Sequence, residues 1–111
     1  MSAITTHVLD TTLGRPARGV PVRLELVADG NVTVLGTGVT DDDGRVSEIG
    51  PARIGPGPYR LVFDIAAYYA ATAQTCFFPE VVLTFATPDT AQHYHVPVLL
   101  SPFAYSTYRG S

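Results

Sequence analysis

Histidine, tyrosine and arginine gather near the end of this chain. His93 and His95 stand two positions apart, so they share one face if their segment is a strand, since strand side chains alternate between faces. The third histidine, His7, lies in a β-branched segment near the other end. Imidazole exchanges protons near neutral pH and is also a common zinc ligand. The histidines therefore leave three alternatives open: acid–base catalysis, a three-histidine metal site and a purely structural role.

The residues that follow the histidines extend this chemistry to the last position of the chain. Tyr108, Arg109 and Ser111 end the sequence abruptly after a β-rich run. Phenol, guanidinium and hydroxyl groups can hold anions or assist proton transfer, so we interpret this end as a candidate site rather than a loose terminus. Cys76 lies in an apolar run beside Phe77, unlike the electropositive setting of a reactive cysteine, and we expect a buried, structural thiol.

A run of three aspartates at residues 41–43 is followed by Gly44 and Arg45. Asp-Gly supplies the backbone freedom for a tight turn, so we interpret the run as a solvated turn that delivers Arg45 to the start of a short strand. A calcium-binding loop would need ligands at alternate positions and a closing glutamate, which this segment lacks.

Strands must position these groups, because short β-branched segments bounded by Gly and Pro dominate the sequence. Strands are expected at residues 3–9, 22–27, 32–40, 45–49, 59–65, 80–87, 93–100 and 103–109. An alanine-rich stretch around residues 66–74 is the one helix we expect. This pattern predicts an all-β fold, a two-sheet antiparallel β-sandwich in which residues 1–111 form a single domain. The strand that holds His7 could pair beside the C-terminal strands and bring the histidines together.

Composition narrows the classes of function. A formal net charge of −3, with 7 dispersed basic residues, argues against a nucleic-acid partner. No segment approaches the ~18 apolar residues of a membrane span, and no secretory signal precedes the first expected strand, so we expect a cytoplasmic protein with no membrane partner. Hydrophobic residues make up 46% and charged residues 15%, a balance that favours burial of apolar surface against other subunits.

Six motifs are spread over nearly the whole chain. They are Thr-His-Val-Leu-Asp at 6–10, Gly-Arg-Pro-Ala at 14–17, Asp-Gly-Arg at 43–45, His-Tyr-His-Val-Pro at 93–97, Leu-Leu-Ser-Pro at 99–102 and Tyr-Arg-Gly-Ser at 108–111. Together they resemble the enzyme branch of the transthyretin-like family, the 5-hydroxyisourate hydrolases. The terminal Tyr-Arg-Gly-Ser is the most specific of them, since the transthyretin hormone carriers lack it.

The resemblance implies a transthyretin-like sandwich that assembles as a homotetramer, a dimer of dimers, with active sites between the dimers. It implies hydrolysis of 5-hydroxyisourate to 2-oxo-4-hydroxy-4-carboxy-5-ureidoimidazoline in urate degradation, without a cofactor or a metal. The alternative is a carrier of small aromatic ligands of the transthyretin type, which would need a wider and more apolar channel.

The resemblance also assigns functional residues. The implied catalytic residues are His7, Arg45, His95 and Ser111, the implied substrate-binding residues are His7, Arg45, Tyr108 and Arg109, and the role of His93 stays open. His7 and His95 would share water activation and proton delivery, and Arg45 would hold the oxygen-rich substrate. Tyr108 would position the ring, and the terminal carboxylate of Ser111 would orient a histidine or the water.

Overall fold

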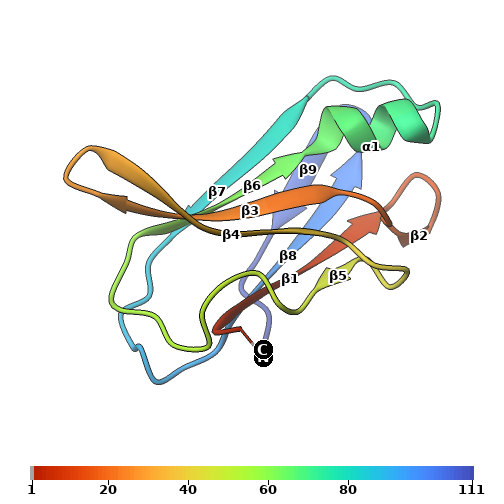
Figure 1. Ribbon diagram of the computed structural model, residues 1–111. Coiled ribbons are helices and arrows are strands. Elements are labelled where there is room, and N and C mark those ends of the chain that lie inside the picture. Colours follow the sequence, from red (N-terminus) through yellow and green to blue (C-terminus); the bar gives the residue numbers. More distant parts are fainter. Residues whose placement is uncertain (1) are drawn as a thin grey trace.

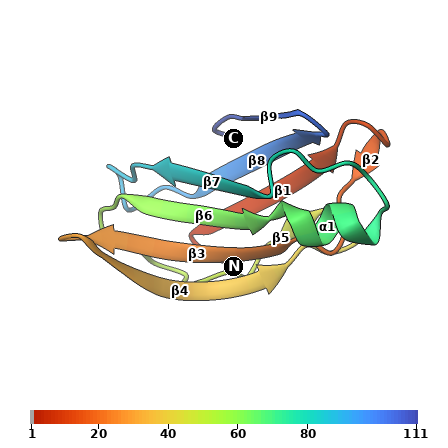
Figure 2. The ribbon, with the colours of Figure 1, turned by 90° about the horizontal axis from the view of Figure 1, so that it is seen from above.

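The computed structural model describes residues 2–111, which fold into two β-sheets and one helix (Figure 1; Figure 2). The first sheet has the strand order β2-β1-β8-β9, with β5 also paired to β1; its strands are β1 (Ile4–Asp10), β2 (Arg15–Pro16), β5 (Arg45–Val46), β8 (Tyr94–Ser101) and β9 (Ala104–Thr107). The second sheet has the order β4-β3-β6-β7 and contains β3 (Pro21–Ala28), β4 (Asn31–Val39), β6 (Tyr59–Asp64) and β7 (Glu80–Phe85). The expected all-β, two-sheet sandwich is confirmed.

The core lies between the sheets and fixes which face of the first sheet is outward. Ile4 and Val8 of β1 and Val98 of β8 are fully buried, and they pack in one cluster with Leu61 and Phe63 of β6. Both β1 and β8 thus turn their even-numbered residues to the core. Because strand side chains alternate, their odd-numbered residues project from the outer face.

One strand pair in the first sheet is parallel, whereas the sequence led us to expect antiparallel sheets throughout. β1 and β8 run in the same direction, with Thr5 opposite His95 and His7 opposite Pro97. Between β1 and β8 the chain forms all the strands of the second sheet, so these two strands are not joined by a hairpin, which would make them antiparallel. The expectation that the strand of His7 lies beside the C-terminal strands is confirmed.

The helix, α1 (Ile65–Ala71), lies at one end of the sandwich (Figure 1; Figure 2) and is shorter than the expected stretch of 66–74. It begins after Asp64, whose side chain accepts a hydrogen bond from the Ala67 backbone N–H. It ends at Thr72, whose hydroxyl donates to the carbonyl of Tyr68. Ala73 then adopts a positive φ of 54°, which stops the helix before residue 74.

Two smaller expectations are corrected by the structure. The segment between the expected strands 3–9 and 22–27, where no strand was expected, contains the two-residue strand β2, which pairs antiparallel with the end of β1. Cys76 is half-buried against the edge of the core rather than fully buried. No helix within residues 2–111 is long and apolar enough to cross a membrane.

Candidate active site

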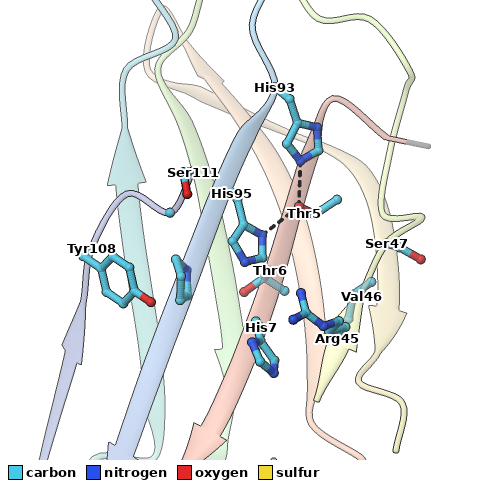
Figure 3. Close-up of a pocket in the computed structure, with 12 residues that line it drawn as sticks. Thr5, Thr6, His7, Arg45, Val46, Ser47, His93, His95, Tyr108 and Ser111 are labelled. Atoms are coloured by element: carbon cyan, nitrogen blue, oxygen red, sulfur yellow. Dashed lines mark hydrogen bonds between the residues drawn. The ribbon is translucent and has the colours of Figure 1, made fainter. Parts of the chain in front are cut away.

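The outer face of the first sheet carries a cavity of about 540 Å³ that gathers most of the expected site residues (Figure 3). Its polar lining comprises Thr5 and His7 from β1, Arg45 from β5, His95 from β8, His93 just before that strand, and Tyr108 and Ser111 beyond β9. The site is therefore assembled from both ends of the chain and from one short strand in the middle.

Strand register explains why these residues meet. His7 lies opposite Arg45 on β5 and opposite Pro97 on β8, which forms one row across the sheet. Thr5 lies opposite His95, and His95 is bridged in turn to Gly110, whose N–H donates to the His95 carbonyl at 2.8 Å. The two rows are separated by two strand residues, about 7 Å. A small planar molecule laid across both rows could contact both sets of side chains.

The hydroxyl of Thr5 stands between two imidazoles (Figure 3). Its Oγ1 is 2.9 Å from Nε2 of His93 and 2.8 Å from Nδ1 of His95. Thr5 is only 8% exposed and His95 is half-buried, so the bond between them is partly shielded from competing water, whereas His93 is exposed. The orientation of the His95 ring is thus set by a hydrogen bond from the neighbouring strand.

His95 is held in its neutral form by its surroundings. Burial lowers the pKa of its imidazole, and the positive charge of Arg45 and the neighbouring rings of His7 and His93 lower it further, against a smaller opposing contribution from a hydrogen bond to the Thr5 backbone. A neutral imidazole at neutral pH has a lone pair that can accept a proton. The site therefore contains a histidine suited to act as a general base.

The turn formed by residues 41–44 positions Arg45. The Asp41 carboxylate accepts hydrogen bonds from the backbone N–H groups of Asp43 and Arg45 at 2.9 and 3.0 Å. Gly44 has a φ of 74°, and a Cβ there would lie 2.3 Å from the carbonyl oxygen of Val8, so glycine is needed for the turn to approach β1. The turn predicted from the sequence thus places a cation directly beside His7.

The structure places Arg109 outside the lining of this cavity, whereas Tyr108 and Ser111 lie within it. Its guanidinium lies over the ring of Tyr94, 4.6 Å from the ring centre, and donates to the Gln92 side chain at 2.6 Å. Tyr108 and Gly110 line the cavity, and the residue between them points to the opposite face because extended chain alternates.

Metal binding gains no support from the geometry. Among residues 2–111 there is no group of three or more His, Cys, Asp or Glu side chains placed to hold a metal ion. His93 and His95 share a threonine hydroxyl instead.

Comparisons with known proteins agree with this arrangement. Residues 4–110 match the HIUase/Transthyretin family. The chain belongs to this family. A 5-hydroxyisourate hydrolase of Salmonella typhi is 45% identical over 109 residues, covering 97% of this chain and 80% of that relative. The structure of Klebsiella pneumoniae 5-hydroxyisourate hydrolase aligns with a TM-score of 0.85 at 34% identity, covering 97% of this chain and 98% of that chain. Sea bream transthyretin in complex with thyroxine aligns with a TM-score of 0.89 at 33% identity, covering 97% and 94%.

Two contributors to the site of this HIUase/Transthyretin chain were not singled out from the sequence. Thr5 carried a usable signal, since it lies two residues before His7 and therefore on the same strand face. The signal at Gly110 was weaker: it is a glycine within the terminal motif, and a glycine often marks a close approach of the backbone to another group. Here the backbone of Gly110 lies against the ring of His95.

Proposed function

We propose that this protein hydrolyses 5-hydroxyisourate to 2-oxo-4-hydroxy-4-carboxy-5-ureidoimidazoline in urate degradation. The observation that carries the proposal is the convergence of His7, Arg45 and His95 from three strands on one cavity. Relatives with 40% identity or more over nearly the full chain bear the name 5-hydroxyisourate hydrolase, which supports the same reaction.

The proposed reaction is attack of water on a ring amide. Neutral His95 takes a proton from the water as its oxygen bonds to the carbonyl carbon, and the carbonyl electrons move onto oxygen. The guanidinium of Arg45 donates to that oxyanion. When the intermediate collapses, the carbon–nitrogen bond breaks and His7, in the adjacent row, delivers a proton to the departing nitrogen. The pKa of His95, lowered by burial and by Arg45, is the reason to assign it the role of base.

The terminal residues complete the proposed binding site. Tyr108 is 58% exposed and lines the cavity, so its ring is free to stack on a planar substrate. Ser111 lines the same cavity, where its hydroxyl can orient the attacking water.

Carriage of a small aromatic ligand is the second candidate, because a transthyretin that holds thyroxine shares this fold. The cavity argues against it. Histidine, arginine, threonine and serine side chains lie among apolar residues such as Val46 and Pro97, and an apolar aromatic ligand would leave these polar groups without partners. Displacement of a fluorescent aromatic probe by thyroxine at micromolar concentration would favour the carrier.

We further propose that the protein acts as a homotetramer, a dimer of dimers, in which the outer face of the first sheet meets a partner. The open position of the cavity and the exposure of large apolar side chains such as Phe103 (66%) and Phe77 (63%) support assembly. Light scattering after size exclusion tests the mass. A cytoplasmic location is proposed with it, where the free thiol of Cys76 would stay reduced, and cell fractionation tests it.

The deciding experiment generates 5-hydroxyisourate in place with urate oxidase and follows its ultraviolet decay with and without this protein. We expect decay well above the spontaneous rate, unchanged after treatment with a chelator. Arg45→Ala should remove most of the acceleration. Arg18→Ala is the matched control, because Arg18 pairs with Asp42 on the exposed surface and does not line the cavity. Decay at the spontaneous rate with folded protein would refute the hydrolase.

A further inference from the structure

The pair of hydrogen bonds at Thr5 restricts where protons can be. A threonine hydroxyl has one proton to donate and lone pairs to accept. Nε2 of His93 and Nδ1 of His95 are both within 3 Å of Oγ1, so Thr5 donates to one ring and accepts from the other when both rings are neutral. The tautomers of the two histidines are therefore coupled through a single oxygen.

Of the two possible arrangements, only one leaves His95 able to act as a base toward the cavity. If Nδ1–H of His95 donates to Thr5, the hydroxyl donates to Nε2 of His93, and Nε2 of His95 keeps its lone pair. In the reverse arrangement Nε2 of His95 carries the proton and has no lone pair. The Thr5 hydroxyl contacts Nδ1 of His95, and His95 lines the cavity, so Nε2 is the ring nitrogen that this arrangement leaves for a bound water.

We propose that Thr5 is a positioning residue of this site: its hydroxyl holds His95 as the Nδ1–H tautomer and passes the proton taken from water on to His93. The inference rests on the proposed hydrolysis and deepens it. It also gives His93 a role, as the outer end of a relay of three groups that begins with His95 beside the attacking water.

Each proton can be followed through the relay of His95, Thr5 and His93. Water gives a proton to Nε2 of His95, and Nδ1–H of the same ring passes its proton to Oγ1 of Thr5. The hydroxyl proton of Thr5 moves to Nε2 of His93, which becomes an imidazolium. His95 is then neutral with its proton on Nε2, the Thr5 hydroxyl points to Nδ1 of His95, and the charge lies on His93, which is exposed to solvent. The starting tautomers return when Nε2 of His95 gives its proton to solvent and the protons move back along the same three groups, which leaves His93 neutral.

Charges around the relay favour proton transfer from His95 towards His93. His95 faces His7 on β1 and Arg45 on β5, and Tyr108 and Ser111 line the same cavity. The cation at Arg45 opposes accumulation of positive charge on His95. A route that moves the proton outward to His93 keeps the base neutral beside that cation.

Thr5→Val is the test, because valine has nearly the same shape and no hydroxyl, and Thr5→Ser is the matched variant that restores the hydroxyl. We expect Thr5→Val to lower kcat by about 10–100-fold, the range seen when a group that orients an imidazole is removed, with little change in KM. Thr5→Ser should recover most of kcat. His93→Ala should produce a similar loss, and the losses of the double variant should not add, because both changes interrupt one chain.

Nuclear magnetic resonance of ¹⁵N-histidine protein supplies a readout that needs no substrate. The wild type should show His95 as the Nδ1–H tautomer, and Thr5→Val should shift it towards Nε2–H. Wild-type acceleration of 5-hydroxyisourate decay tests the reaction itself, so the two proposals fail separately. Unchanged kcat and an unchanged His95 tautomer in folded Thr5→Val protein would overturn the role of Thr5. Thr11→Val, which removes a threonine hydrogen bond to Leu100 away from the cavity, controls for stability.

Discussion

Gly110→Ala should lower the activity, because the added methyl group would collide with the ring of His95. The backbone at residue 110 lies against the ring of His95, and a Cβ built there stands 2.6 Å from Cδ2 and 3.3 Å from Cγ of that ring. Non-bonded carbons sit about 3.5–4.0 Å apart at their optimum. Ring and terminal segment must therefore separate by about 1 Å. Gly110 does not have a positive φ, so the conflict comes from the ring and not from the backbone conformation.

The expected magnitude follows from that displacement. Moving a catalytic group by 1 Å costs about 100-fold in rate, which corresponds to about 2.7 kcal/mol of activation free energy. Stability should change far less, because residue 110 lies beyond β9 and makes one backbone hydrogen bond, to the carbonyl of His95. Loss of that bond is worth about 1 kcal/mol, or roughly 5 °C in Tm.

The assay compares kcat/KM for 5-hydroxyisourate with the thermal unfolding midpoint of each variant. Gly55→Ala is the control, since a Cβ at residue 55 meets nothing within 4 Å, and it should leave both quantities near wild type. A Gly110→Ala protein with full activity would show that the terminal backbone does not constrain His95, and the argument would fail.

Further outcomes are expected for activity and for stability. The acid limb of the rate profile should lie below pH 6.5, the ordinary imidazole value, because burial and nearby positive charge lower the pKa of His95; a limb above pH 6.5 would exclude His95 as the base. Between pH 6.5 and the lower pKa of His95 in the folded protein, this histidine is protonated more in the unfolded state than in the folded state. The free energy of unfolding should therefore decrease as pH falls through that range. In chemical denaturation, His95→Gln should make the free energy of unfolding less dependent on pH there. Deleting residues 108–111 should cost about 100-fold in rate and only a few degrees in Tm, and comparable losses of both would make the segment structural. Asp10→Asn should lower the free energy of unfolding by about 2–4 kcal/mol in urea denaturation, because Asp10 is 1% exposed and its carboxylate accepts hydrogen bonds from Tyr68 and Gln74. Burial alone would raise the pKa of Asp10, but these bonds lower it, so its stabilisation is present above pH 3.8 and is lost as pH falls through the lower folded value; wild-type stability that does not fall there would contradict this account.

Much of the architecture was accessible from periodicity. Alternating segments such as 22–27 and 59–65 became β3 and β6, because burial of one sheet face demands a period of two. Short elements were less predictable. β2 and β5 have two residues each and are strands only because they pair with β1. Their boundaries therefore could not be predicted from the local sequence pattern.

The candidate site shows the same division. His7, Arg45, Tyr108 and Ser111 were expected from their chemistry and from the resemblance, and they line one cavity. Arg109 was expected with them, and its guanidinium lies over Tyr94 instead, on the other face of the extended segment. Thr5 was not singled out, because a threonine in a strand is ordinary until the residue opposite it is known.

The sequence by itself determined the classes of side chain, the strand periodicity and the terminal motif, since these are properties of neighbouring residues. Only the tertiary structure decided that β1 and β8 run parallel with Thr5 opposite His95 and His7 opposite Arg45. Periodicity states which face a residue occupies but not which strand lies beside it or in which register. Register comes from the packing of two sheets around a shared core, and here that packing places a hydroxyl between two imidazoles.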